Sequence, residues 1–242
     1  SLINSTAIPS GATAYEIEQS LRFNNNDSPV LSRTISTPSD ADTWTISMWL
    51  KRSAVSEAAY HYVWSYKDAS SISGIQFGAS TSDSKPDSIY LYNSTQGQQY
   101  VDSGNYVVRD ASAWYHLVVK CSTNTATIYI NGVEVQGSLT MPNMVVGEMT
   151  IGDWNNSHYW DGYIGEVNFI DGAAKAPSDF GETGDYGEWK PLEYSGTYGN
   201  NGFYLPFKQD YTVEGFSTVI YKGTDAERYI GGVGFSADLM WF

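Results

Sequence analysis

Apolar and polar residues alternate along most of the chain, and this two-residue period predicts β-strands. The clearest example is residues 43–50, whose even positions share one face of the expected strand and are Trp44, Ile46, Met48 and Leu50. Similar patterns bounded by turn residues predict further strands over 60–66, 72–77, 88–92, 99–108, 114–121, 125–130, 133–135, 159–170 and 203–207. The sequence has no long helical period. We therefore predict an all-β protein whose short strands pack as two sheets.

The strongest turn signal is Asn131-Gly132, between the strands predicted at 125–130 and 133–135. Asn and Gly readily adopt the positive φ angles of a type I′ turn, whose twist matches that of the flanking strands. We predict a β-hairpin here, next to the strand 114–121. In this register Trp114 is expected to be buried.

Three features predict departures from regular strands. Gly162 and Gly165 interrupt the strand expected over 159–170 and indicate a β-bulge. Pro206 cannot donate a ladder hydrogen bond, so we expect it at a sheet edge or at the end of a strand. Residues 173–180 fit one short helical turn, whereas the Gly-rich, acidic residues 181–188 resemble a surface loop.

Charge and composition argue against several classes of function. The 242 residues include 27 acidic and 13 basic side chains, which gives a net charge of −14. Binding to nucleic acid or to an anionic membrane surface depends on clustered Lys and Arg, so we expect neither. No apolar stretch reaches the about 18 residues that membrane insertion requires. Cys121 is the single cysteine and ends an apolar run, which favours a buried structural thiol over a nucleophile.

Several segments, taken in order, resemble the laminin-G-like (concanavalin-A-like) family. They are Ser20–Phe23, Val30–Arg33, Thr43–Arg52, Ala113–Val119, Ile128–Val133 and Trp160–Val167. The resemblance covers residues 15–172 and implies a two-sheet antiparallel jelly-roll sandwich, here with an extra C-terminal β segment. It also implies loops at one edge that bind sugars or Ca²⁺.

A narrower resemblance links the chain to virion proteins of marine tailed bacteriophages. It rests on Leu2–Pro9, Asp171-Gly172, Phe180–Glu182 and Tyr198–Leu205, while Gly231–Trp241 resembles the start of a second β module. The resemblance implies a tail fibre or surface appendage on the virion exterior. Other virion proteins are then expected partners, and a homo-oligomer, with a trimer as the commonest fibre symmetry, is expected.

These patterns divide the chain into four parts. Residues 1–14 are an N-terminal arm, and residues 15–172 form the jelly roll. Residues 173–212 are a Gly- and Tyr-rich extension that closes the domain. Residues 213–242 show new strand signals and end on three large apolar residues. We expect this last part to be a docking tail or the start of a second β module.

Calcium is the one candidate cofactor. Ca²⁺ takes several oxygen ligands, usually including carboxylates. One candidate cluster contains Asn24, Asn26 and Asp27, and the other is Asp153 with its neighbouring asparagines. Both clusters are also ordinary turn sequences, because Asn and Asp bond to their own backbone and tolerate left-handed conformations.

The densest candidate for sugar binding is the segment 153–160. Sugar recognition places an aromatic face on the pyranose ring and satisfies the hydroxyls with polar side chains. The segment supplies both kinds of group, and the candidate residues are Asp153, Trp154, Asn155, Asn156 and His158. The alternative is that Tyr159 and Trp160 start the next strand and pack in the core, which leaves Trp154 as an interface residue.

The sequence contains little that indicates catalysis. Related jelly-roll glycoside hydrolases place carboxylates two residues apart on one strand face. Glu16 and Glu18 have that spacing but precede the domain, and Asp161 and Glu166 are five residues apart, which sends them to opposite faces of a regular strand. We therefore expect a non-catalytic virion protein that binds host surface glycan or neighbouring virion proteins. The alternatives are a capsid decoration or adaptor without glycan binding and, less favoured, a glycan-cleaving enzyme.

Overall fold

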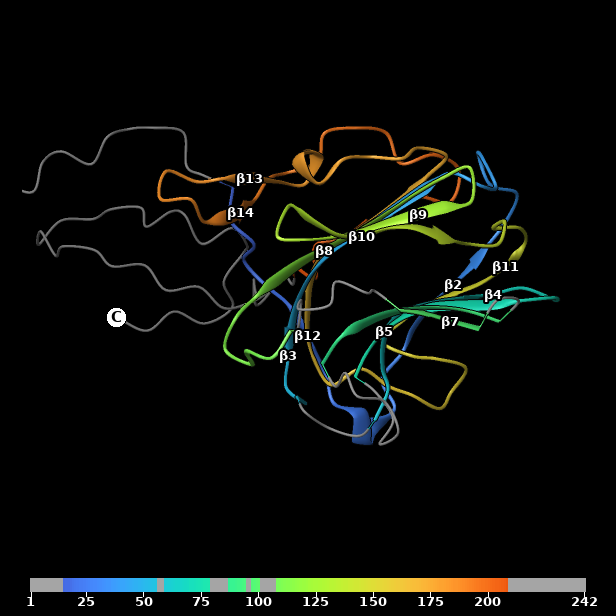
Figure 1. Cartoon of the computed structure of the whole chain (residues 1–242), viewed down its shortest axis with the longest axis horizontal. Coiled ribbons are helices and arrows are strands. Elements are labelled where there is room, and N and C mark those ends of the chain that lie inside the picture. Colours follow the sequence, from blue (N-terminus) through green and yellow to red (C-terminus); the bar gives the residue numbers. More distant parts are fainter. Residues whose placement is uncertain (1–14, 56–58, 79–86, 95–96, 101–107, 209–242) are drawn as a thin grey trace, which may run out of the picture. The chain divides into compact units, whose positions relative to one another are not determined.

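The computed structural model describes residues 15–55, 59–78, 87–94 and 108–208 in full, and residues 97–100 as backbone (Figure 1). Contacts within the chain divide it into two units, Ser1–Lys208 and Gln209–Phe242, and all described residues belong to the first. The predicted arm 1–14, the predicted tail 213–242 and most of the strand expected over 99–108 lie outside the described residues. No helix in the described part is long and apolar enough to cross a bilayer.

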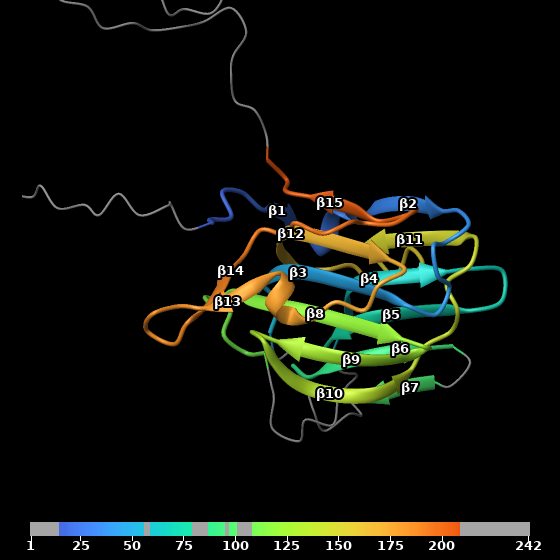
Figure 2. The same cartoon turned by 90° about the horizontal axis from the view of Figure 1, so that it is seen from above.

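The described strands form two large antiparallel sheets, so the all-β prediction is confirmed (Figures 1 and 2). The first sheet contains, in spatial order, β1 (Leu21–Phe23), β12 (Gly162–Asp171), β3 (Trp44–Arg52), β8 (Tyr115–Ser122), β9 (Thr125–Ile130) and β10 (Val133–Thr140), and β15 (Phe203–Leu205) also pairs with β12. The second sheet contains β2 (Leu31–Ile35), β11 (Gly147–Ile151), β4 (His61–Lys67), β5 (Ile72–Phe77), β6 (Ile89–Asn93) and β7 (Gly97–Tyr100).

The core lies between these sheets, and the alternating pattern of β3 explains its position. The predicted inward residues of β3 are all buried there: Trp44, Ile46, Met48 and Leu50. Trp44 contacts Trp64 of β4 with ring centroids 5.3 Å apart, so the two sheets meet through aromatic rings. Cys121 is fully buried in the same core, and burial raises the pKa of its thiol to about 12. The thiol is therefore unreactive at neutral pH.

The predicted turns and bulge are present. Asn131 and Gly132 have φ angles of 49° and 79°, as a type I′ turn requires. In β12 the register with β3 shifts between Gly165 and Asn168, and Glu166 has a φ of 53°. The sequence indicated both features because they depend on the backbone preferences of the local residues and not on distant contacts.

Residues 173–198 pack on the outer face of the first sheet, the face opposite the core (Figure 1), whereas β15 joins the sheet itself beside β12. They contain the short helix η2 (Pro177–Asp179) and the strands β13 (Gly181–Thr183) and β14 (Trp189–Pro191). Phe180 and Tyr194 stack at 5.0 Å and pack on Val118 and Ile170. The segment predicted as a loop over 181–188 is thus largely part of a β-hairpin. Its strands have three residues each, too few to show an alternating pattern.

Trp114 is not buried as expected, since 38% of its surface is exposed. It precedes β8 and lies on the outer side of the first sheet, where its ring meets Tyr163 edge-on at 6.5 Å. The inward-facing neighbour is Tyr115, which packs against the core. The predicted hairpin is present, but the expectation that Trp114 is buried was wrong.

Candidate functional site

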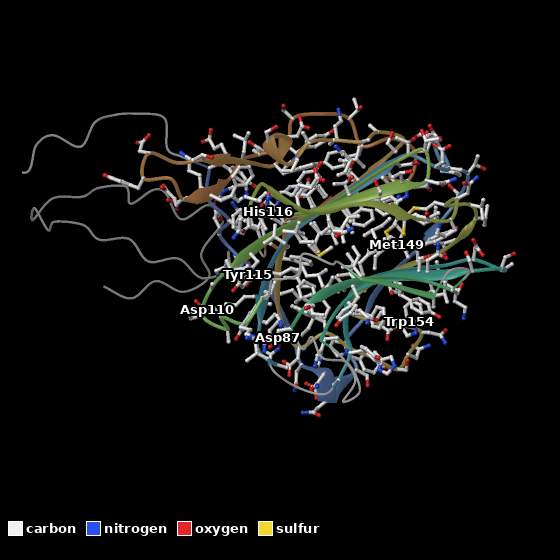
Figure 3. All side chains as sticks on the ribbon, viewed as in Figure 1. Asp87, Asp110, Tyr115, His116, Met149 and Trp154 are labelled. Carbon is white, nitrogen blue, oxygen red and sulfur yellow. The ribbon has the colours of Figure 1, made fainter. Side chains whose placement is uncertain are left out.

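The loop between β11 and β12 lies on the outer side of the second sheet. Figure 3 shows Met149 between the two sheets and Trp154 on the far side of the second sheet. The loop leaves β11 at Ile151 and returns to the core at Trp160, which is fully buried and meets Phe77 at 5.4 Å. The expectation that Trp160 packs in the core is therefore confirmed.

Trp154 is the centre of an aromatic cluster. Its ring stacks on Tyr62 of β4 with centroids 4.5 Å apart and meets Tyr92 of β6 edge-on at 4.8 Å. His158 lies 6.1 Å from Tyr62 and contacts Tyr60 edge-on at 5.8 Å. We name this cluster the Trp154 patch. Trp154 is only half-buried, so part of its indole surface meets solvent.

The second sheet provides a flat support for the patch. Tyr62 lies across β5 at Gly74, where a Cβ atom would stand 2.9 Å from the tyrosine ring. A side chain at this position would displace Tyr62 and, with it, Trp154. The absence of a side chain at Gly74 is thus what lets the two aromatic rings stack flat on the sheet.

Asp153 shapes the loop from its first turn. Its side chain is buried, and its Oδ2 accepts a hydrogen bond from the backbone N–H of Asn156 at 3.0 Å. Its carbonyl oxygen accepts another from the hydroxyl of Thr150. Asn155 and Asn156 have φ angles of 48° and 59°, a conformation that Asn tolerates better than most residues. This turn places Trp154 against Tyr62.

Polar groups border the patch. Asn155, Asn156, Ser157 and His158 are exposed, and Asn155 accepts a hydrogen bond from the Lys67 ammonium at 2.8 Å. Burial lowers the pKa of His158, and the nearby Asp153 carboxylate opposes part of that effect. At neutral pH the imidazole is therefore neutral, with one nitrogen that donates and one that accepts.

Two polar side chains near the patch have unused hydrogen-bonding capacity among the described residues. Gln76, which pairs with Tyr62 in the register of β4 and β5, is fully buried, and neither amide atom has a partner. Asp153 Oδ1 also has no partner. Buried polar atoms without partners are uncommon in native proteins.

The two predicted calcium clusters are built as turns. Asn24 caps the short helix η1 (Asn25–Asp27), accepts a bond from the backbone of Asn26 and donates one to Asp27 at 2.8 Å. In the second cluster, Asp153 bonds to Asn156 as described above. Among the described residues, no group of three His, Cys, Asp or Glu side chains could hold a metal ion. Calcium binding at Asn24, Asn26, Asp27 or Asp153 stays a prediction.

The carboxylates considered for catalysis lie in separate settings. Asp161 forms an ion pair with Arg22 at 2.7 Å. Glu166 is buried at the bulge, where it accepts a hydrogen bond from Tyr15 at 2.5 Å. Glu16 and Glu18 are exposed in the segment that precedes β1, and this segment packs against β12 rather than standing apart from the domain.

The structure brings together Asp153, Trp154, Asn155, Asn156 and His158, since they share one loop. It adds Tyr60, Tyr62 and Tyr92, which sequence reasoning treated as packing or subunit-contact residues or did not single out. The alternation over 60–66 could have placed Tyr60 and Tyr62 on one face. Their meeting with Trp154 depends on the sheet order β11-β4-β5-β6, which no local pattern specifies.

Comparisons with known proteins identify the family of this chain. Residues 24–178 match the family model described as concanavalin A-like lectin/glucanases superfamily. No curated protein matches the sequence. Among solved structures, the chain is similar to domain 4 of a GH43 extracellular arabinanase from Geobacillus stearothermophilus, solved with arabinotriose (15% identity, 60% of this chain, 68% of that one, TM-score 0.44). It is also similar to a heptameric SAP-like pentraxin from Limulus polyphemus (16% identity, 67% of this chain, 80% of that one, TM-score 0.48). On the strength of the family match, the chain belongs to the concanavalin A-like lectin/glucanases superfamily.

Proposed function

We propose that this protein binds glycan through the Trp154 patch and does not transform it. The observation that carries the proposal is the half-buried Trp154, stacked on Tyr62 and bordered by exposed Asn155 and Asn156. An aromatic face suits the apolar C–H surface of a pyranose, and amides can donate to and accept from its hydroxyls. Membership of a lectin and glucanase superfamily supports the same ligand class.

The patch is preorganised, which favours binding. The sheet fixes Tyr62, and the hydrogen bond from Asn156 to Asp153 fixes the loop. A sugar that binds here orders few additional side chains, so less of the interaction free energy is lost to entropy. Burial raises the pKa of Tyr62, so its hydroxyl stays protonated at neutral pH.

The non-catalytic part of the proposal rests on where the carboxylates lie. Glycoside hydrolysis commonly uses two carboxyl groups about 5–10 Å apart across the scissile bond. Asp161 is engaged by Arg22, and Glu166 by Tyr15 and Tyr204. Asp153 is used in the turn that shapes the loop. These engagements favour a binding role over the glycan-cleaving alternative.

We place this binding activity on the exterior of a phage virion, in a tail fibre or surface appendage that attaches to host glycan. The support is the resemblance to phage virion proteins over Leu2–Pro9 and Tyr198–Leu205. A cryo-EM reconstruction of the source particle tests this location. Solvent-facing patches at a distal tip support attachment, whereas burial of Trp154 against neighbouring subunits supports the decoration or adaptor alternative.

The binding proposal is tested with a glycan array, followed by calorimetric titration of the best oligosaccharide. Trp154→Ala is expected to weaken binding at least about tenfold, because the aromatic platform is lost. Tyr186→Ala is the matched control, since Tyr186 is 96% exposed at the tip of the β13–β14 hairpin. Equal affinities for wild-type protein and Trp154→Ala, or no binding to any glycan, would overturn the proposal.

A further inference from the structure

The sequence contains two Asn–Gly dipeptides, Asn131-Gly132 and Asn201-Gly202, and the structure describes both. Such a dipeptide can deamidate without an enzyme, because glycine has no side chain to hinder attack by its backbone nitrogen on the asparagine amide carbon. The attack forms a cyclic succinimide, and the side-chain nitrogen leaves as ammonia. Water then opens the ring to give aspartate or isoaspartate. Each dipeptide is therefore a candidate modification site, and its surroundings decide whether the attack occurs.

Asn201 is held at both ends of its side-chain amide. Its Oδ1 accepts hydrogen bonds from the backbone N–H and the hydroxyl of Ser36, at 3.0 and 2.9 Å. Its Nδ2 donates to Asp171 Oδ2 at 3.1 Å and to the Ser36 carbonyl oxygen at 3.4 Å. The residue is only 2% exposed. Rotation of this amide toward the Gly202 nitrogen would break these bonds and remove a donor from the buried Asp171 carboxylate, which is costly.

Asn131 is held by a single bond of its side-chain amide. Its Oδ1 accepts a hydrogen bond from the backbone N–H of His116 at 2.8 Å. Within the described part of the chain, neither Asn131 Nδ2 nor the backbone N–H of Gly132 makes a hydrogen bond. Both residues are half-buried at the turn between β9 and β10, so part of their surface meets water. The leaving nitrogen and the attacking nitrogen are thus both free.

We propose that Asn131 is a site of spontaneous deamidation in the folded protein, whereas Asn201 is protected until the chain unfolds. The Gly132 nitrogen loses its proton to solvent and bonds to Cγ of Asn131, and the Nδ2 group leaves as ammonia. One water molecule then hydrolyses the succinimide, so the reaction needs no cofactor or oxidant. The proposal concerns the first sheet and does not depend on glycan binding at the Trp154 patch.

The isoaspartate product should disturb the outer side of the first sheet. Its main chain runs through the former side chain, which lengthens the turn that joins the paired Ile130 and Val133. Gly132 lies against Trp189, since a Cβ atom at Gly132 would stand 2.5 Å from the indole ring. Trp189 in turn donates its indole N–H to His116 Nδ1 at 2.9 Å. Movement of Gly132 should therefore loosen Trp189 and the hairpin β13–β14, which lies at the same end of the sheet (Figure 2).

The test follows both dipeptides in one sample of the folded protein stored in mildly alkaline buffer, with a second sample stored in urea. Peptide mapping by mass spectrometry measures aspartate and isoaspartate at each position over time. In the folded sample, conversion at Asn131 should be at least about tenfold faster than at Asn201, because more hydrogen bonds oppose the attack at Asn201. In urea the two rates should become similar, because neither amide is then held.

Two variants make the result specific. Ser36→Ala removes a hydroxyl that holds Asn201, so conversion at Asn201 should become faster while conversion at Asn131 stays the same. Asn131→Gly removes the reactive amide and keeps a residue that suits the positive φ of the turn. On storage, hydrogen exchange of the Trp189 indole N–H should become faster in the wild type and stay unchanged in Asn131→Gly.

The proposal is overturned if the folded protein converts Asn201 as fast as Asn131. It is equally overturned if Asn131 stays intact over a period in which both residues convert in urea. Unchanged conversion of Asn201 in Ser36→Ala would show that these hydrogen bonds do not protect it. Unchanged exchange at Trp189 after Asn131 has converted would contradict the expected effect on the hairpin.

Discussion

His116 is buried and neutral, and its neighbours fix its tautomer. Nδ1 accepts from the Trp189 indole at 2.9 Å, so Nε2 carries the hydrogen and donates to the Ser47 hydroxyl at 2.8 Å. Burial lowers the pKa of His116 from 6.5 to about 3. The imidazolium form is therefore strongly disfavoured in the folded protein.

This residue should make the fold sensitive to acid. Below pH 6.5 a histidine in the unfolded chain takes up a proton, while folded His116 does not until about pH 3. The unfolded state then binds more protons, so stability is lost as the pH falls through this window, by at most about 1.4 kcal/mol per pH unit. Urea unfolding of wild type and His116→Gln between pH 4 and 7 measures the difference. Identical pH slopes in the two proteins would show that His116 does not remain neutral.

Two tryptophans should differ sharply in their effect on stability. Trp160 is fully buried between the sheets, so Trp160→Ala should cost about 3–5 kcal/mol in the free energy of unfolding. Trp114 is 38% exposed, so Trp114→Ala should cost less than half as much. Denaturant unfolding of both variants checks the order. A larger loss in Trp114→Ala would contradict the position described for that side chain.

At the scale of single residues, the sequence predicts inward positions better than outward ones. Alternation in β3 correctly placed Trp44, Ile46 and Met48 in the core. It could not show that Trp49 and His116, on the opposite face, are also buried. Trp189, far away in the sequence, covers His116, and Trp49 stacks on His116, so local periodicity holds no information about their burial.

At the scale of elements, Asp171 joins three segments. Its buried carboxylate accepts hydrogen bonds from the backbone N–H of Ser39 at 2.9 Å and from the backbone and side-chain N–H groups of Asn201. These bonds connect the end of β12 to the segment before β3 and to the segment before β15. The Asp171 carboxylate thus links the C-terminal extension, which begins at residue 173, to the β-sandwich.

Asp171→Asn should therefore loosen the extension. The substitution replaces one acceptor oxygen by a donor and removes the charge, so we expect a loss of about 2–4 kcal/mol in stability. Asp185→Asn is the control, because Asp185 is exposed in the β13–β14 turn. Thermal unfolding compares the two variants. An Asp171→Asn protein as stable as its control would mean that these hydrogen bonds contribute little.

The element boundaries show which interactions a sequence reveals. Strands with alternating patterns, such as β3, β8 and β9, were predicted within about two residues of their observed limits. The hairpin β13–β14 was missed because its stability comes from contacts of Trp189 with Gly132, Gly181 and His116. Such contacts depend on single residues at particular positions, so they produce no periodic pattern in the sequence.

At the scale of the whole molecule, the Trp154 patch lies on the outer side of the second sheet, where Trp154 meets Tyr62 and Tyr92. The sequence predicted the patch in part, because the loop 153–158 is contiguous. It did not predict that Tyr62 and Tyr92 join the patch, because only the sheet order β11-β4-β5-β6 brings those strands to the loop.

The most direct test of the central claim is a crystal structure of the protein with the oligosaccharide selected by the array. We predict a sugar ring against the exposed part of Trp154, with hydrogen bonds to Asn155, Asn156 or His158. A complex in which the sugar lies elsewhere and the Trp154 patch stays empty at saturating ligand would contradict the claim.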